Sequence, residues 1–409
     1  MIHQKRRQEL LSRLSENALV IVSSNSEQTR NNDVNYPFRP DSSFWYLTGF
    51  TEPDAIAVFS SKNYSIFVRP KDKTKEIWEG ERLGVRSAPK TLLADNAYSI
   101  DDFLKTIHKL IDKNSLVYFD DSSTNKLNEN ISSILVNAVK PIKPVISEMR
   151  LIKDSNEIQN IQTAANLAAK AHMKAMTKVS PGLYEYQIAA EIDAEFRSEN
   201  ADHAYPPIVA GGKNGCILHY TKNNKVLNDG ELILIDAGCE SLGYASDITR
   251  TFPINGRFSK AQKQIYQIVL SAQKSAIASI KPGVKVNTPH EIACDTISRE
   301  LTKLGIMKDQ DNLSEFYMHK TGHWLGLDVH DVGEYKIDND FRVFEEGMVT
   351  TVEPGIYIRK NDKIDSKYWN IGIRIEDDVL VTKNGHQILS KSAVKEVKDI
   401  ENLMSQNIT

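Results

Sequence analysis

Two prolines near the middle of the chain, Pro141 and Pro144, place the strongest constraint on how it can fold. Both stand in residues 139–145, where proline removes backbone donors and disfavours helix at the residue before it. We therefore expect an extended linker in this run. The chain has 409 residues, and a single hydrophobic core stops growing at about 250–300 residues. Two domains are predicted, residues 1–150 and residues 151–409, with the linker at their boundary.

The charge, hydropathy and cysteine content of the chain limit its partners and its location. Lysine and arginine (51) nearly balance aspartate and glutamate (54), so no basic surplus is present to hold a phosphate backbone, and nucleic acid is not expected. No apolar run approaches the roughly 20 residues of a membrane span, and the N-terminal residues are too polar for a signal peptide. Cys216, Cys239 and Cys294 are odd in number and widely spaced. We expect a cytoplasmic protein without membrane contact.

Local patterns before the linker predict an α/β domain. Short β-rich runs at residues 18–22 and 65–68 are separated by helical stretches such as residues 100–111. After the linker, Asp154 and Ser155 can cap a helix that carries an apolar stripe. A second domain is expected to begin there.

The second domain alternates helices with strands of antiparallel type. Residues 185–200 and 260–280 have apolar side chains at helical spacing, whereas residues 231–236 and 371–376 have the two-residue period of strands. In the last of these runs, the charged Arg374 and Glu376 share one face. The second domain is therefore predicted to be α+β.

Acidic residues stand where apolar strands begin or end. Asp236 closes one apolar run, Asp247 opens the next, and Glu353 precedes a Pro-Gly turn at the end of a third. Burying a carboxylate costs several kcal/mol unless it is paired or bound to a metal. Each of these residues taken alone is more typical of a solvated strand end. The case for a site depends on their occurring together.

Histidines gather in one short stretch. His319, His323 and His330 stand among Gly322 and Gly326, which permit close approach of backbones. A single histidine in such surroundings is usually a hydrogen-bonded core residue, but three together favour a functional site.

Two aspartates, one histidine and two glutamates form the ligand set expected for a pair of divalent ions. Hard oxygen donors with one imidazole suit Mn²⁺, Fe²⁺, Co²⁺ or Zn²⁺. Two such ions lower the pKa of a bridging water and polarise a carbonyl, which is hydrolytic chemistry. The sequence has no zinc-protease helix, nucleophile turn, Walker loop or dinucleotide fingerprint, so nucleotide and redox chemistry are disfavoured.

Six blocks of residues carry a resemblance to a known family. They are residues 217–220, 234–240, 245–253, 319–331, 351–357 and 372–377. In order and spacing they closely resemble bacterial aminopeptidase P, the Xaa-Pro aminopeptidases of peptidase family M24B. Residues 36–50 are similar to the N-terminal domain of that family, so the resemblance covers nearly the whole chain.

The resemblance implies an α+β catalytic domain of the pita-bread fold, preceded by a smaller α/β domain that narrows access to the site. It implies a metallo-aminopeptidase that hydrolyses the N-terminal Xaa-Pro bond with two divalent ions and a bridging hydroxide. Mn²⁺ is expected first, with Co²⁺, Zn²⁺ and Fe²⁺ as other choices. The substrates would be peptides with proline at position 2, whose tertiary amide lacks the N–H that peptidases binding extended strands use.

The motif match also implies roles for the acidic residues. Asp236 would bind one metal ion, Asp247 and Glu376 would bridge both, and His323 and Glu353 would complete the other. Glu353 would in addition move the proton as general base and acid.

Further active-site positions follow from the same match. His219 and His330 would contact the scissile amide and its developing oxyanion, and Arg374 would hold a ligand carboxylate from behind. His319 and Tyr357 also match active-site positions, with His319 forming a wall of the proline pocket.

The N-terminal domain matches the family less completely. Trp78 resembles a tryptophan that reaches the site of a neighbouring subunit, which implies a homodimer or homotetramer, whereas the alternative is a core tryptophan of this domain. Close relatives bring an arginine from this domain to the site, but the present chain has no arginine between Ser87 and Met149.

Three alternatives remain at this point. A prolidase with the same five ligands would take only Xaa-Pro dipeptides, and the segments around Trp45 and Trp78 and residues 323–326 favour the aminopeptidase over it. A metal-free binding module of the same fold would not need every ligand to be present. A creatinase-like amidinohydrolase also lacks the metal set.

Overall fold

The computed structural model describes residues 2–111, 115–120, 128–129, 131–132, 139–308 and 310–406, without the side chains of 310–312. The chain divides into two compact units, Met1–Met149 and Arg150–Thr409. Each unit is described by itself. Among the described residues, no helix is long and apolar enough to cross a bilayer.

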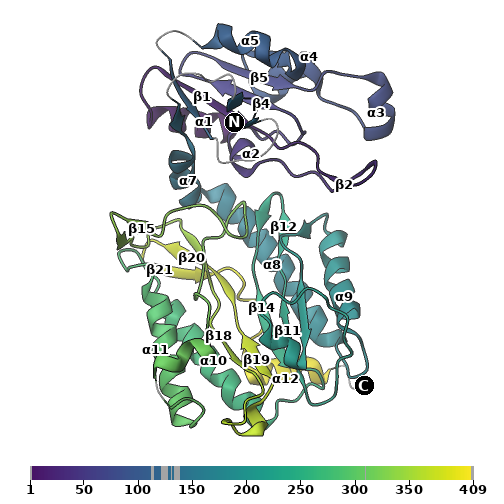
Figure 1. The fold of residues 1–409 in the computed structure, drawn as a ribbon, viewed down its shortest axis with the longest axis vertical. Coiled ribbons are helices and arrows are strands. Elements are labelled where there is room, and N and C mark those ends of the chain that lie inside the picture. The colour runs from purple at the N-terminus through teal and green to yellow at the C-terminus, as the bar shows by residue number, and fades with distance from the viewer. Residues whose placement is uncertain are drawn as a thin grey trace. The chain divides into compact units, whose positions relative to one another are not determined.

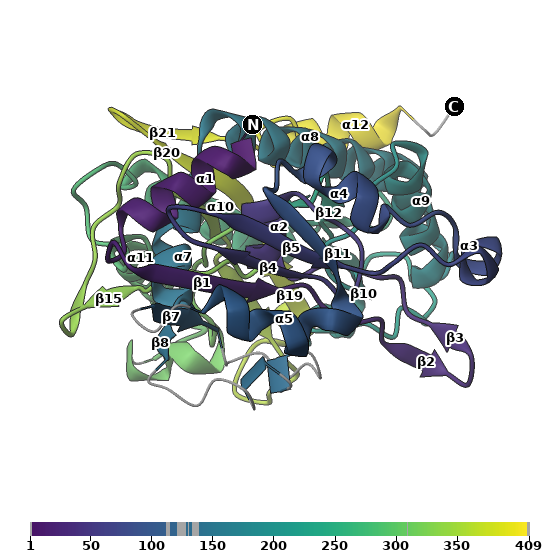
Figure 2. The same cartoon turned by 90° about the horizontal axis from the view of Figure 1, so that it is seen from above.

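The first unit is built on a six-stranded mixed sheet. Its order is β6-β5-β4-β1-β7-β8, with β1 antiparallel to β4 and parallel to β7. The strands of this unit are β1 (Ala18–Ser23), β2 (Thr29–Asn31), β3 (Val34–Asn35), β4 (Ile56–Phe59), β5 (Tyr64–Val68), β6 (Asn96–Ser99), β7 (Leu116–Phe119) and β8 (Lys140–Pro141). Figure 2 shows β1, β4 and β5 side by side.

Helices cover the sheet of this unit. They are α1 (Ile2–Ser12), α2 (Ser42–Thr48), α3 (Lys73–Glu79), α4 (Gly84–Leu92) and α5 (Phe103–Leu110), with the 3-10 turn η1 (Ile100–Asp102) before α5. Phe103 and Ile107 of α5 pack on Leu19 and Ile21 of β1. Every residue of β1 is buried, as expected of a strand that is covered on both faces. The predicted α/β character of this half is confirmed.

The expected extended linker is wrong in part. Residues Lys140 and Pro141 form the short edge strand β8, but helix α7 (Lys143–Leu151) begins two residues later. Pro144 lies in the first turn of α7, where a helix needs no backbone N–H and the fixed φ of proline is already helical. Proline here starts a helix and does not forbid one.

The second unit combines several small antiparallel sheets. Their orders are β10-β11-β14, β13-β12-β9, β15-β16, β17-β20-β21 and β18-β19. The strands are β9 (Asp202–His203), β10 (Ile208–Gly211), β11 (Leu232–Asp236), β12 (Cys239–Ser241), β13 (Tyr244–Ala245), β14 (Thr249–Pro253), β15 (Lys336–Ile337), β16 (Asp340–Phe341), β17 (Val349–Val352), β18 (Gly355–Ile358), β19 (Ile371–Arg374), β20 (Asp377–Thr382) and β21 (Gly385–Ile388).

Two helix pairs flank these strands (Figure 1). The helices are α8 (Ser155–Lys178), α9 (Glu185–Ser198), α10 (Lys260–Ala278), α11 (Thr288–Lys303) and α12 (Val397–Ser405), with 3-10 turns η2 (Gly212–Cys216), η3 (Gln310–Glu315) and η4 (Ser366–Tyr368). The predicted cap of α8 is confirmed, because the Asp154 side chain accepts from the backbone of Glu157 while the Glu157 side chain reaches back to Asp154 N. The α+β character of the second half is likewise as predicted.

Close backbone contacts bring distant strands together at two glycines. A Cβ on Gly322 would lie 2.1 Å from the Thr351 carbonyl oxygen, and a Cβ on Gly372 would lie 2.1 Å from the Gly215 carbonyl oxygen. Real Cβ atoms do not approach so closely, so only glycine fits at these positions. The close approach expected at Gly322 is confirmed.

Candidate metal centre

The predicted ligand residues stand at the ends of strands that meet in the second unit. Asp236 ends β11, Asp247 lies just before β14, Glu353 follows β17 and Glu376 follows β19. The strand expected over residues 371–376 stops at Arg374, so Glu376 lies in the break before β20. The expected turn between Asp236 and Asp247 is a hairpin of β12 and β13.

Backbone hydrogen bonds join these segments in pairs. Ala237 N donates to Ile248 O at 3.1 Å, which fixes the residue after Asp236 to the residue after Asp247. Glu376 N donates to Thr249 O at 3.1 Å. The segments of Asp236, Asp247 and Glu376 therefore form one connected backbone unit.

The loop that carries His323 is tied to β17 in the same way. Thr351 N donates to His323 O at 2.9 Å, and Glu353 N donates to Thr321 O at 2.8 Å. His323 and Glu353 are thus held at fixed positions on one side of the site.

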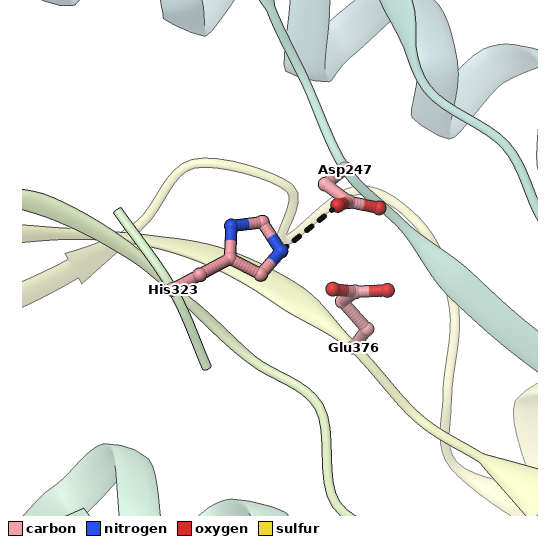
Figure 3. Close-up of side chains that lie close together, drawn as sticks. All are labelled: Asp247, His323 and Glu376. Carbon is pink, nitrogen blue, oxygen red and sulfur yellow. Dashed lines mark ion pairs between the residues drawn. The ribbon is translucent and has the colours of Figure 1, made fainter. Parts of the chain in front are cut away.

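Asp247, His323 and Glu376 form the tightest group. Each offers a ligand atom within 4.8 Å of the others. Figure 3 shows the His323 ring directed at the Asp247 carboxylate, with the Glu376 carboxylate beside both. His323 Nδ1 lies 3.0 Å from the Trp324 carbonyl oxygen, so Nδ1 carries a proton and Nε2 is left for a metal ion.

All five predicted ligands line one cavity of about 1160 Å³. Four of the ligands are carboxylates, those of Asp236, Asp247, Glu353 and Glu376, and Arg374 lines the same cavity. In the metal-free protein this arrangement raises proton affinities. Burial, followed by the charge of Asp247, raises the pKa of Glu376 well above its usual value.

The pKa values of two other ligands change in the same direction. Burial raises the pKa of Glu353 to about 7, although the charge of His323 opposes the rise. Burial alone would lower the pKa of His323, but its hydrogen bond to Asp247 and the charge of that carboxylate raise it to about 9. In the metal-free site, Glu353 and His323 therefore hold their protons more tightly than usual. These protons offset part of the negative charge that metal ions would otherwise balance.

Arg374 holds two parts of the site together. Its Nη2 donates to Asp236 Oδ2 at 2.6 Å, its Nη1 donates to the Tyr357 hydroxyl at 3.0 Å and its Nε donates to Thr249 Oγ1 at 3.0 Å. The Thr249 hydroxyl in turn donates to Glu376 Oε2 at 2.6 Å. Arg374 thus reaches one ligand carboxylate directly and a second through a threonine.

Tyr205 is a site residue that the sequence analysis missed. Its hydroxyl lies 2.6 Å from Asp236 Oδ1 and 2.5 Å from Asp247 Oδ1, so one phenol proton serves two ligand carboxylates. Burial and then the charge of Asp236 raise the pKa of Tyr205 well above its usual value. Tyr205 precedes two prolines outside any strand, and nothing in that pattern marks it as a contact of Asp236.

The remaining predicted histidines lie around the cavity. His219, His319 and His330 all line it, and the His330 ring lies 4.4 Å from the His323 ring, centroid to centroid, at 81°. His319 Nε2 lies 2.8 Å from the Tyr357 hydroxyl. Burial, followed by the charge of Arg374, lowers the pKa of His319 to about 4, so its ring is neutral.

Trp78 is the one predicted site residue that belongs to the first unit. It belongs to α3 of the first unit, and its side chain is 84% exposed. The alternative of a core tryptophan is therefore wrong. Ile77, next to it, is 81% exposed, so the end of α3 presents two large apolar side chains to solvent.

The residues around the cavity fit divalent metal ions. Excess carboxylate with one imidazole available at Nε2 supplies hard ligands that the protein neutralises only in part. An acidic group of this kind, at the floor of a large cavity, is typical of metallohydrolases.

Comparison with known proteins places the chain within that class. The model of metallopeptidase family M24 matches residues 159–383, and that of the aminopeptidase P N-terminal domain matches residues 3–118. The chain belongs to metallopeptidase family M24 and carries the aminopeptidase P N-terminal domain. The catalytic unit accordingly has the pita-bread fold.

Individual relatives extend over the whole chain. The Xaa-Pro aminopeptidase of Haemophilus influenzae is 45% identical, covering 98% of this chain and 96% of that protein. The structure of Pseudomonas aeruginosa aminopeptidase PepP is 41% identical with a TM-score of 0.96, covering 100% of this chain and 99% of the other. The structure of Escherichia coli aminopeptidase P with the inhibitor Pro-Leu is 39% identical with a TM-score of 0.96, covering 99% and 98%.

Proposed function

We propose that this chain is an Xaa-Pro aminopeptidase, a metallopeptidase that hydrolyses the bond between the first residue of a peptide and a proline in second position. The observation that carries the proposal is the convergence of Asp236, Asp247, His323, Glu353 and Glu376 on the floor of one large cavity in an M24 chain. The metal-free binding module is disfavoured because every ligand is present and directed into the same space.

The proposed cofactor is a pair of divalent ions, with Mn²⁺ as the first choice and Co²⁺, Zn²⁺ or Fe²⁺ as others. Asp236 would hold one ion, Asp247 and Glu376 would bridge the pair, and His323 and Glu353 would complete the second. The positive charge of the two ions would offset the carboxylates that Arg374 alone does not balance. When bound, the ions supply a hydroxide at neutral pH and polarise the scissile carbonyl.

The protein's own residues would then perform the proton transfers and hold the substrate. Glu353 accepts a proton from the attacking water and passes it to the proline nitrogen, a role suited to a carboxyl whose pKa is raised to about 7 in the metal-free protein. His330 and His219 donate hydrogen bonds around the scissile amide, with His330 at the developing oxyanion. His319, backed by Tyr357, forms a wall for the proline ring, and its neutral imidazole suits an apolar partner.

The size of the cavity bears on substrate length. Its volume of about 1160 Å³ exceeds the roughly 300–1,000 Å³ of pockets that enclose drug-sized ligands. An Xaa-Pro dipeptide is smaller than most such ligands, so room remains for residues beyond the proline. We therefore favour the aminopeptidase over a prolidase, whose site must close on the dipeptide carboxylate.

Rates on three peptides test this choice. With the same Mn²⁺ loading, kcat/KM is measured for Ala-Pro, Ala-Pro-Ala and Ala-Ala-Ala. We expect the tripeptide with proline to be cleaved fastest and the proline-free control to be cleaved poorly. A tenfold preference for the dipeptide, which is about 1.4 kcal/mol of transition-state binding, would overturn the choice in favour of prolidase.

We also propose how the chain assembles and where it is located. The exposed Trp78 supports a homodimer or homotetramer in which residues 1–150 contribute oligomer contacts and limit substrate access. The three cysteines, all free thiols, support a cytoplasmic location. Sedimentation of the wild type and Trp78→Ala tests the first point, because a variant with an unchanged assembly and an unchanged KM would exclude a role for Trp78.

A further inference from the structure

Two buried polar side chains that the mechanism does not use contact the backbone beside the metal ligands. We propose that His172 and Asp378 are positioning residues that fix the Asp236 and Asp247 segments and thereby set the affinity of the site for metal ions. This inference rests on the proposed metal centre. Neither side chain lines the cavity, so any effect on the site must pass through the backbone.

His172 acts on the Asp236 segment from helix α8. Its side chain is completely buried, and Nε2 lies 3.0 Å from the carbonyl oxygen of Ala237, the residue after Asp236. Nδ1 has no hydrogen-bond partner among the described residues, so the single proton of the neutral ring belongs on Nε2. Burial lowers the pKa of His172 to about 4, although the bond to Ala237 opposes the change. The imidazole is therefore a neutral, fixed donor.

The same contact reaches the second aspartate through the backbone. Ala237 N donates to the carbonyl oxygen of Ile248 at 3.1 Å, and Ile248 directly follows Asp247. One imidazole thus supports both backbone segments at the point where they are paired.

Asp378 acts on Asp247 from strand β20. Its carboxylate is fully buried, and its two oxygens lie 3.2 and 3.3 Å from Asp247 N, so the carboxylate accepts from that amide. The backbone of Asp378 is itself fixed, because Asp378 N donates to Ser390 Oγ at 3.1 Å and Leu389 N donates to Asp378 O at 2.8 Å. The backbone amide of Asp247, a proposed bridging ligand, is therefore hydrogen-bonded to a side chain whose own backbone is held in place on both sides.

Such support is needed because the ligands repel one another. Four carboxylates in one cavity separate unless the backbone holds them, and any energy spent on gathering them is subtracted from metal binding. Partners that orient metal ligands typically change metal affinity by about 10- to 100-fold when they are removed. We expect effects of this size from His172 and Asp378, with substrate KM at saturating metal unchanged.

The test is a Mn²⁺ titration of full-length variants in competition with a chromophoric chelator, together with metal-free Tm. His172→Phe keeps a ring but removes the donor, and Asp378→Leu keeps the size but removes the acceptor, whereas Asp378→Asn keeps an acceptor oxygen. Tyr266→Phe is the matched control, since the Tyr266 hydroxyl donates to the carbonyl oxygen of Lys395 at 2.7 Å, away from the ligands.

We expect His172→Phe and Asp378→Leu to bind Mn²⁺ about 10- to 100-fold more weakly, Asp378→Asn to stay near the wild type, and Tyr266→Phe to lose Tm without losing affinity. If His172→Phe does not fold, the Asp378→Leu and Asp378→Asn pair decides. The inference is overturned if the affinities match the wild type, or if only Tm falls, as in the control. A wild type that binds no Mn²⁺ would instead overturn the proposed function, on which the inference depends.

Discussion

Glu376 and Asp377 are consecutive buried acids with opposite electrostatic surroundings. Glu376 faces a cavity in which Asp236, Asp247 and Glu353 are also acidic. Asp377 lies in a closed cluster in which each oxygen meets a cation. The two groups, the open acidic group and the Asp377 cluster, differ in how far cations of the chain balance their carboxylates.

The Asp377 cluster is balanced by the protein itself. Asp377 Oδ1 accepts from Arg250 Nη2 at 2.7 Å and from Ser390 Oγ at 2.7 Å, while Oδ2 accepts from Gln273 Nε2 at 2.7 Å and from Lys395 Nζ. Burial alone would raise the pKa of Asp377, but Arg250 and then Lys395 hold it well below the usual value.

The open acidic group shows the reverse. Burial raises the pKa of Asp236, Glu353 and Glu376, which the nearby cations do not fully offset. Burial alone would raise the pKa of Asp247 as well, but its hydrogen bond to His323 and the charge of that ring together lower it. Removing one partner from a buried ion pair destabilises a fold, and a buried acid that is left unpaired carries a cost that a bound cation can offset. The comparison therefore teaches that the two groups differ in the countercharge around their acids more than in the number of acids.

The largest expected effect comes from Glu376→Ala. We predict that turnover is abolished and that metal content falls, because a proposed bridge is lost, while the metal-free protein is at least as stable as the wild type. Metal analysis, kcat on Ala-Pro-Ala and metal-free Tm check the three parts. Unchanged metal stoichiometry together with unchanged activity would contradict the ligand assignment.

Asp377→Ala should have the opposite profile. Its removal leaves Arg250 and Lys395 buried without their partner, which typically costs about 3–5 kcal/mol of unfolding free energy. Denaturant unfolding measures the loss, and Asp377→Asn, which keeps the shape but not the charge, is the control. A variant as stable as the wild type would break the distinction between the two groups.

His330→Ala sharpens the comparison within the open site. His330 lines the cavity but is not among the proposed ligands, so its loss should reduce kcat about 10²- to 10³-fold, or roughly 2.7–4 kcal/mol, with metal retained. Single-turnover rates and metal content, measured on the same sample, show whether the rate falls while the metal is retained. If the variant loses metal, then His330 is a ligand and the proposed ligand set is incomplete.

The last prediction concerns the pH dependence of the metal-free protein. Folding raises the pKa of Glu353 from 4.5 to about 7 and that of His323 from 6.5 to about 9. Both groups bind protons more tightly when folded, so their contribution is complete below the unfolded pKa and is lost as pH rises through the folded value. Stability in the presence of a chelator should therefore fall between about pH 4.5 and 9.

Tm with and without Mn²⁺ across that range measures the effect, which we expect to be of the order of 2–4 °C for each kcal/mol. Glu353→Gln should flatten the lower part of the fall. A metal-free Tm that rises steadily from pH 5 to pH 8 would show that the carboxyls are not protonated in the folded state.

Much of the site could be predicted from the sequence, because the two-residue period of strands and the position of acidic residues at strand ends are visible there. The two-residue period predicted that Arg374 and Glu376 share one face, and both line the cavity although the strand itself stops at Arg374. Apolar runs ending in acid located Asp236 and Glu353. The resemblance to bacterial aminopeptidase P then singled out the five ligands, whose metal binding remains a prediction.

The contacts that could not be predicted from the sequence depend on how distant strands pair. Tyr205 and His172 act through segments that become neighbours only when β11 and β14 pair, so no local pattern marks them. Period alone also shows that Glu376 and Asp377 face opposite ways but not which of them meets Arg250. The linker prediction was wrong at Pro144 because the start of a helix satisfies the same constraints as an extended chain.

The adjacency of Glu376 and Asp377 limits how this segment can change over evolution. Inserting or deleting one residue in β19 would exchange the two environments, placing a paired acid in the cavity and an unpaired one against Arg250. Substitutions elsewhere in the strand can be compensated one at a time, whereas a change of length damages folding and chemistry together. Among homologues, this short stretch should accumulate substitutions but not gaps.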